Sequence, residues 1–280
     1  MPEDLSELEN SGFSRRAVIA AGLTGLTLGA CSAPGSTPAS TSHGKPHSSA
    51  PMTTRPQPGS SSGSGSGSGP APEPAIAKTP GDDIVSGPRD HKAVALTFHG
   101  QGPAELVHEI LSACHRADAH ITVFAVGNWI EATPSLGREI LAAGHELGNH
   151  TWSHQQMKQL SPAEAVREAQ KGADALRAAV GTAGWWFRPS GTQHSTATIR
   201  AAAQAAGYQR CVSYDVDPGD YLDPGASAVR DRTLAGVQPG SIVSLHFGHT
   251  GTAKALPEIL AGLSRKGLAP VTLSRLLATA

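Results

Sequence analysis

Short apolar runs alternate with longer stretches of helical periodicity from about residue 90 to the end of the chain. The apolar runs predict buried strands. The stretches between them predict helices, of which one opens with the capping box Ser161-Pro-Ala-Glu164. Since each strand is followed by a helix, the strands should run parallel in one sheet covered by helices, which is an α/β fold. We expect strands at 93–98, 121–126, 145–148, 185–188, 210–213, 242–246 and 270–272, and helices at 103–117, 134–143, 161–180, 196–206, 226–234, 256–266 and 273–278. About seven strand and helix pairs favour a barrel over an open doubly wound sheet.

The first 89 residues predict an export signal followed by a linker. Arg15-Arg16 is a twin-arginine pair before an apolar run at 17–30, which is shorter than the roughly 20 residues that a membrane-spanning helix needs. The run closes with Leu-Gly-Ala-Cys31, which resembles a bacterial lipobox whose cysteine receives the lipid. The residues that follow are rich in Pro, Ser, Thr and Gly and predict a disordered linker. We therefore expect a signal segment at 1–31, a linker at 32–89 and a folded domain at 90–280, in a protein that is exported and lipid-anchored at Cys31 to the outer face of the cell membrane.

Composition excludes one class of partner. Charged residues make up 16% of the chain and the formal net charge is −1, so the sequence indicates no basic surface for nucleic acid. We expect a monomer. Cys114 and Cys211 lie in apolar surroundings, which favours buried free thiols, although the sequence leaves a disulfide between them open.

Histidines and other polar residues gather where the expected strands end. His150 and His154 are four residues apart, and on one helical turn both imidazoles would point at a single cation, although two surface histidines would give the same spacing. Active sites of parallel barrels lie at the carboxyl ends of the strands. The polar residues that follow expected strands in this way are His99, His150, Arg188, Asp217, Asp220 and His246. Their positions favour the interpretation of His150 and His154 as site residues.

Residues 142–151 read A-A-G-H-E-L-G-N-H-T and resemble the second motif of the polysaccharide deacetylase family, also called the NodB-homology family or carbohydrate esterase family 4. In that family an H-[ST]-x-x-H motif supplies two ligands of a catalytic divalent metal, and His150, Thr151 and His154 match it. The resemblance covers residues 90–280 and implies an irregular (β/α)7 barrel of the NodB-homology type. It also implies a divalent metal cofactor, with zinc favoured and cobalt or nickel as alternatives.

The first motif of the family is altered in this chain. Family members usually read T-F-D-D-G-P, with one aspartate as base and the next as metal ligand, whereas residues 97–103 read T-F-H-G-Q-G-P. His99 stands in the place of the first aspartate. Its neutral imidazole could act as the base or join His150 and His154 as the third metal ligand, but not both at once. Other residues that could complete the metal site are Gln101, His194 and His249.

The third motif, usually R-P-P-Y-G, corresponds to residues 187–192, which read F-R-P-S-G-T. By resemblance, Arg188 would hold the catalytic carboxylate, and the N–H of Gly191 would help to bind the oxyanion. Because the expected carboxylate partner of Arg188 is missing from the first motif, a purely structural role for this arginine remains an open alternative.

Residues 217–221, D-P-G-D-Y, and 240–247, G-S-I-V-S-L-H-F, resemble the fourth and fifth motifs. They imply that Asp220 orients His246, which would protonate the leaving nitrogen. Alternatively, His246 could be a strand-end histidine bonded to a backbone carbonyl. The two motifs also imply a substrate pocket lined by Leu245, Tyr221 and Asp217.

Together these motifs predict a metal-dependent hydrolase that removes acetyl groups from N-acetylated sugars of a cell-envelope glycan, either peptidoglycan or a chitin-like polymer. The missing acid pair keeps a second hypothesis open, which is a catalytically inactive glycan-binding lipoprotein with the same fold. A third hypothesis is a metal-free hydrolase that cleaves the carbon–nitrogen bond of a non-sugar amide.

Overall fold

The computed structural model describes residues 73–278. The expected signal segment at 1–31, the lipidation site Cys31 and the expected linker up to residue 72 lie outside the described residues. Residues 73–89, which we assigned to the linker, pack on the domain instead: Ala77 and Ile84 are buried, and Ile84 pairs with Val212. The folded part therefore begins before residue 90, because these apolar side chains join the core. Among residues 73–278, no helix has both the length and the apolar character that crossing a membrane requires.

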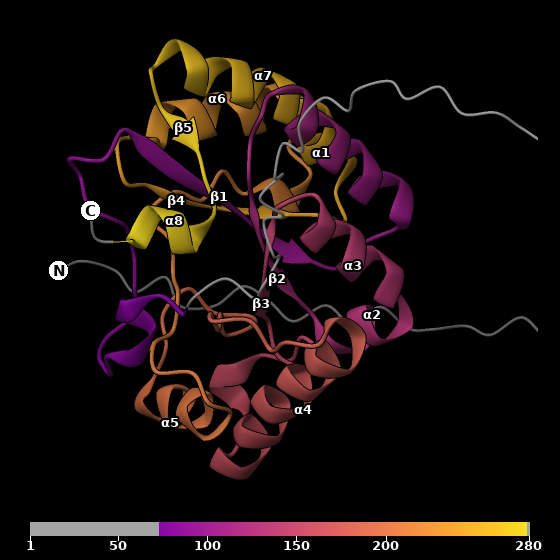
Figure 1. Ribbon diagram of the computed structural model, residues 1–280, viewed down its shortest axis with the longest axis vertical. Coiled ribbons are helices and arrows are strands. Elements are labelled where there is room, and N and C mark those ends of the chain that lie inside the picture. The colour runs from indigo at the N-terminus through magenta and orange to yellow at the C-terminus, as the bar shows by residue number, and fades with distance from the viewer. Residues whose placement is uncertain (1–72, 279–280) are drawn as a thin grey trace, which may run out of the picture. The chain divides into compact units, whose positions relative to one another are not determined.

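A parallel sheet forms the centre of the domain (Figure 1). Its strands are β1 (Ala93–Gly100), β2 (Thr122–Ala125), β3 (Glu146–Asn149), β4 (Ile242–His246) and β5 (Ala269–Pro270). They lie in the order β3-β2-β1-β4, and the short β5 pairs with the start of β1. In this register His99, near the end of β1, lies opposite His246, the last residue of β4. The expected parallel α/β fold is confirmed, and it places two histidines of the expected site side by side.

Single-residue bridges close this sheet into a barrel. Phe187 pairs in parallel with the end of β3 and with Cys211, and Val216 pairs with the middle of β4. The segment 211–216 therefore contacts the neighbour on each side and completes the ring of strands. This closure agrees with the expected barrel.

Two of the expected strands are less regular than their sequences suggest. Residues 185–188 and 210–213 hold the expected places in the barrel but form isolated bridges. The first of them lies between Gly184, whose φ is +71°, and Pro189, which has no N–H to donate, so a longer ladder cannot form there.

Helices surround the barrel (Figure 1). They are α1 (Ala104–Arg116), α2 (Gly127–Ala132), α3 (Pro134–Ala142), α4 (Pro162–Val180), α5 (Ala197–Ala205), α6 (Ala226–Gly236), α7 (Thr250–Arg265) and α8 (Leu273–Leu277), with short 3-10 helices η1 (Ala75–Lys78), η2 (Met157–Gln159) and η3 (Asp220–Leu222). The expected capping box of α4 is confirmed, since the side chains of Ser161 and Glu164 each accept from the other's backbone N–H. The sequence did not predict α2, which is a short helix directly after β2.

Side chains of β1 alternate between two environments. Val94, Leu96 and Phe98 pack in a core that includes α1 and α7, whereas Ala95 packs in a second core with barrel residues such as Phe124. The first core therefore lies between the sheet and the outer helices, and the second lies inside the barrel. By the same alternation, the next inward-facing positions of β1 are 97 and 99, so His99 points into the barrel at its carboxyl end.

Candidate metal and catalytic site

Three histidines meet at the carboxyl end of the barrel. His99 comes from β1, His150 follows β3, and His154 lies in the next loop. Each offers a ring nitrogen, and these nitrogens lie within 4.8 Å of one another. The ring centroids of His99 and His150 are 4.2 Å apart, and those of His150 and His154 are 4.9 Å apart. The structure therefore brings together the three histidines that the sequence suggested as candidate metal ligands.

The loop that carries His150 and His154 is not the helical turn that their spacing suggested. Thr151 and His154 have left-handed backbone conformations, with φ of +67° and +57°. The carbonyl of Thr151 accepts from the N–H of Gly127 (2.8 Å), at the start of α2, so it is not available for a helical hydrogen bond. The two imidazoles converge because of this loop, and the helical reason that we gave for their convergence was wrong.

Hydrogen bonds fix the tautomer of His150. Its Nδ1 lies 2.8 Å from the carbonyl oxygen of Arg188, and since a carbonyl can only accept, Nδ1 carries the proton. The lone pair is then on Nε2. This atom and Nδ1 of His99 are buried without a hydrogen-bond partner among the described residues. A buried polar atom without a partner costs about 1 to 3 kcal/mol, so two such atoms in one cluster call for a ligand.

The surroundings of the three imidazoles favour their neutral form. Burial lowers the pKa of His99 and of His150 well below the ordinary histidine value, and the neighbouring histidines lower both further. Burial, and then the charge of His246, lowers the pKa of His154 as well. Neutral imidazoles with free lone pairs are the form that binds zinc, and three of them leave a fourth position for a water or substrate oxygen. The donor set therefore fits a divalent metal.

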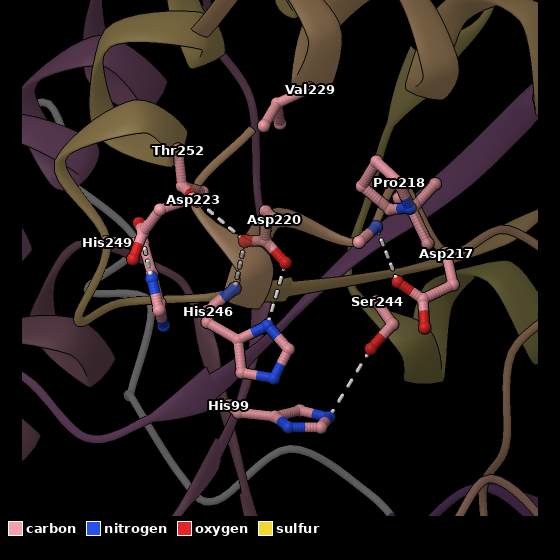
Figure 2. Close-up of polar contacts among 12 residues, drawn as sticks. His99, Asp217, Pro218, Asp220, Asp223, Val229, Ser244, His246, His249 and Thr252 are labelled. Atoms are coloured by element: carbon pink, nitrogen blue, oxygen red, sulfur yellow. Dashed lines mark hydrogen bonds and ion pairs between the residues drawn. The ribbon is translucent and has the colours of Figure 1, made fainter. Parts of the chain in front are cut away.

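His246 is held by a buried carboxylate (Figure 2). Its Nδ1 lies 2.8 Å from one oxygen of Asp220, and its backbone N–H donates to the other oxygen at 2.8 Å. The hydroxyl of Thr252 also donates to Asp220, at 2.6 Å. The ring of His246 lies 4.2 Å from the ring of His99, as measured between centroids. Asp220 thus fixes a ring that reaches the three-histidine cluster, as the fourth and fifth motifs implied.

Arg188 is buried inside the barrel, with 1% of its surface exposed. Its guanidinium donates to the hydroxyl of Thr97 (2.8 Å) and to the carbonyls of Val212 (3.2 Å) and Ser213 (2.9 Å). It forms no ion pair with any residue of the range 73–278. Burial lowers the pKa of Arg188 to about 9. In this structure the arginine joins β1 to the segment 211–216, and the hydroxyl of Thr97 takes the place of a carboxylate partner.

Leu245 does not line the site, contrary to our expectation. It is fully buried and packs in the core between the sheet and the outer helices. Side chains alternate along β4, so Ser244 and His246 face the barrel interior while Leu245 faces outward. The hydroxyl of Ser244 lies 3.4 Å from Nε2 of His99. The alternation along this strand was a signal that could have identified Ser244 from the sequence.

Three other expected site residues lie at the surface. Tyr221 is 50% exposed, and its ring centroid lies 5.5 Å from that of His246. Asp217 is exposed and accepts the N–H of Gly219 at 2.8 Å, so it shapes the turn before Asp220. Gly191 has φ of +65° and lies against the side chain of Gln156. Their roles in binding substrate or the oxyanion remain predictions.

Neither of the two remaining candidate histidines belongs to the cluster. The side chain of His194 is 59% exposed, with Nδ1 3.8 Å from a carboxylate oxygen of Asp83. His249 is 2.8 Å from Asp223, and neither histidine belongs to the described ligand cluster. Gln101 is exposed. The two thiols of the described residues, Cys114 and Cys211, are free and buried, as expected.

Glu168 is a residue of the site that sequence reasoning missed. It lies on α4, is 7% exposed, and accepts four hydrogen bonds from the loop that carries His154. A signal was present, because the buried face of α4 includes Ala165, Glu168, Ala169 and Gly172 at helical spacing. An acid on the apolar face of a helix needs a polar partner.

Comparisons with known proteins agree with this geometry. The sequence pattern of a family described as polysaccharide deacetylase matches residues 86–211. A peptidoglycan-N-acetylglucosamine deacetylase of Bacillus cereus is 30% identical over 194 residues, which covers 68% of this chain and 90% of that protein. A chitooligosaccharide deacetylase of a Bradyrhizobium species is 30% identical over 216 residues, which covers 69% of this chain and 92% of that protein.

Solved structures are also similar. A wild-type pseudoenzyme of carbohydrate esterase family 4 from Bacillus anthracis superimposes with a TM-score of 0.64 at 26% identity, covering 69% of this chain and 68% of that one. A mutant of this pseudoenzyme with restored enzymatic activity gives a TM-score of 0.65, also at 26% identity and with 69% and 70% of the two chains covered. The sequence match to the Bacillus cereus protein covers nearly all of that relative, and the fold and the motif histidines agree with it. The chain belongs to the polysaccharide deacetylase family.

Proposed function

We propose that the protein is a metal-dependent hydrolase that removes acetyl groups from N-acetylated sugars of a cell-envelope glycan, peptidoglycan or a chitin-like polymer. The observation that carries this proposal is the cluster of His99, His150 and His154, which presents neutral imidazoles with two unpartnered buried nitrogens. The relatives support the substrate class, since they include deacetylases of peptidoglycan and of chitooligosaccharides.

The three histidines would hold the metal, with zinc favoured and cobalt or nickel as alternatives. When bound, the ion would act as a Lewis acid toward the acetyl carbonyl and a water molecule. His99 is then the third ligand and not the base. Its Nδ1 is buried without a hydrogen-bond partner among the described residues, and its Nε2 contacts the hydroxyl of Ser244 at 3.4 Å.

His246 would protonate the leaving nitrogen of the sugar. Asp220 accepts at Nδ1, so Nε2 is the ring atom that can carry a proton to the substrate. Gly191 would offer its N–H to the oxyanion, and Tyr221 and Asp217 would contact the sugar at the rim. Arg188 would place a buried positive charge inside the barrel, below a site in which negative charge develops on the acetyl oxygen.

The site would act outside the cell. The twin-arginine pair and the lipobox-like sequence ending at Cys31 support a protein that is exported and held by a lipid at the outer face of the cell membrane. Such an anchor would place the domain beside the envelope glycan that we propose as its substrate.

A second candidate function is glycan binding without catalysis. The observation that favours it is the absence of any Asp or Glu oxygen from the histidine cluster in residues 73–278. The similarity to a solved pseudoenzyme of the same family supports it too. This candidate and the hydrolase differ in what they do to an acetylated sugar.

Incubation of the purified protein with N-acetylglucosamine oligomers and with peptidoglycan tests the proposal. We expect acetate release with zinc or cobalt, loss of activity in chelator, and loss of activity in His150→Ala. Binding of the oligomers without acetate release under any metal condition would favour the inactive glycan-binding protein. Full activity in chelator would favour a metal-free hydrolase.

A further inference from the structure

We propose that Glu168 of α4 is a positioning residue for the metal site. Its carboxylate holds the loop 151–155 in the conformation that turns His150 and His154 toward one point. The inference rests on the proposed metal-dependent function, since it concerns how the chain arranges the histidines that would bind the ion.

The contacts of Glu168 define this role. One carboxylate oxygen accepts the backbone N–H groups of Trp152 (3.2 Å) and Ser153 (2.9 Å). The other accepts the hydroxyl of Ser153 (2.8 Å) and the side-chain amide of Gln155 (3.1 Å). The four donors come from consecutive parts of one loop, and the acceptor comes from a different element. The carboxylate therefore joins the segment between the two histidines to the rigid helix α4.

The loop needs such support because its backbone conformation is unfavourable. Thr151 and His154 are not glycines, yet both have positive φ values, +67° and +57°. Side chains with a Cβ rarely adopt this conformation unless surrounding contacts impose it. Glu168 binds the two residues that lie between them, so its hydrogen bonds act where the chain changes direction.

The adjacent surface of α4 fits closely against the same loop. The side-chain amide of Asn149 donates to the carbonyl of Ala169 (2.8 Å), and its oxygen accepts the N–H of Thr151 (2.9 Å). A Cβ atom added to Gly172 would lie 2.8 Å from the carbonyl carbon of Thr151. Helix α4 thus contacts the loop through Glu168 and through a position where only glycine leaves enough space.

The opposite side of the loop has weaker anchors. The hydroxyl of Thr151 shares a hydrogen bond with the hydroxyl of Ser190 (3.0 Å), which donates to the carbonyl of Gln155 (2.5 Å). These groups are neutral, and none of them contacts Trp152 or Ser153 through the backbone N–H groups that Glu168 binds. Loss of the Glu168 carboxylate would leave these two N–H groups without their acceptor, and the loop could relax away from the paired histidines.

Glu168→Gln keeps the size of the side chain but replaces one acceptor oxygen by an NH2 group, which faces donors. Partners that orient metal ligands typically change metal affinity by about 10- to 100-fold when mutated. We therefore expect zinc affinity of the full chain, measured by competition with a chromophoric chelator, to fall by about 10- to 100-fold. We also expect the visible absorption of bound cobalt, which reports ligand geometry, to change.

Glu164→Gln is the matched control. Glu164 lies one helical turn before Glu168 on α4, and its described hydrogen bonds go to Ser161, where it caps the helix, and not to the loop. This variant should lose thermal stability and keep the zinc affinity and cobalt spectrum of the unmodified protein. If Glu168→Gln does not fold, Ser153→Ala decides, because it removes one donor to the carboxylate and should weaken zinc binding to a smaller extent.

The result that would overturn the inference is unchanged zinc affinity and an unchanged cobalt spectrum in Glu168→Gln, or in Ser153→Ala where the first variant does not fold. A merely structural glutamate would lower the melting temperature and leave both readouts as they are. Failure of the proposed function is distinguishable, since it appears in the unmodified protein itself, as absent metal binding or as absent acetate release.

Discussion

Replacement of His99 by leucine should stabilise the protein when metal is removed and abolish its stabilisation by zinc. Nδ1 of His99 is buried without a hydrogen-bond partner among the described residues, and Nε2 makes only a 3.4 Å contact with Ser244. A buried polar atom without a partner costs about 1 to 3 kcal/mol, and leucine occupies a similar volume without polar atoms. The free energy of unfolding in chelator should therefore rise by roughly this amount.

Zinc should raise the Tm of the unmodified protein and leave that of the variant unchanged. A ligand at 100 times its Kd stabilises the folded state by about 2.7 kcal/mol, and 1 kcal/mol shifts the Tm of a domain of this size by about 2 to 4 °C. In chelator, His99→Leu should melt about 2 to 12 °C above the unmodified protein. At that zinc concentration the unmodified protein should gain about 5 to 11 °C, and the variant should gain nothing.

Thermal unfolding followed by circular dichroism, with chelator and with zinc, measures both effects. His194→Leu is the control, because this histidine is exposed and lies outside the ligand cluster. It should leave the zinc effect intact. The reasoning would be refuted if His99→Leu melted below the unmodified protein in chelator and was still fully stabilised by zinc. His99 would then be neither a destabilising residue of the metal-free protein nor a metal ligand.

Acid should destabilise the metal-free protein, since burial lowers the pKa of His150 well below its ordinary value and that of His145 to about 4. Below about pH 6.5 the unfolded chain binds these protons and the native chain does not, so urea titrations should show a loss of up to about 1.4 kcal/mol per pH unit for each histidine. Asp220→Asn removes the carboxylate that holds His246, so kcat should fall by about 100-fold or more while zinc affinity stays unchanged. Leu245→Ala should lower the free energy of unfolding by about 2 to 5 kcal/mol without altering KM, and a raised KM for N-acetylglucosamine oligomers would return Leu245 to the substrate pocket.

The barrel could be predicted because its signals are local. Each apolar run and each helical stretch is a property of neighbouring residues, and the capping box at Ser161 marks the start of α4 within four positions. The pairing of Asp220 with His246 could be inferred from the motifs, which implied that the aspartate orients the histidine. These predictions needed no knowledge of contacts between distant segments.

The loop at His150 could not be predicted in the same way. Its two left-handed residues depend on acceptors and donors from Asn149, α2 and Glu168, and these contacts exist only once the barrel has formed. The spacing of His150 and His154 suggests a helix because it carries no information about these partners. The orientation of Leu245 was predictable, because side chains alternate along a strand and its neighbours Ser244 and His246 face the barrel interior. Our assignment of Leu245 to the pocket did not apply this alternation.

Because Arg188 is present, the altered first motif could accept an aspartate at position 99. In the described residues, the guanidinium of Arg188 donates only to hydroxyl and carbonyl oxygens. Its positive charge also contributes to lowering the pKa of His99. A barrel with such a cation already contains the counterion for an acid on its first strand. Histidine and aspartate codons differ by a single base, so the exchange of position 99 between an imidazole and a carboxylate is within reach of ordinary mutation. The buried guanidinium would then stabilise a carboxylate at position 99, and no second substitution would be needed to supply a counterion.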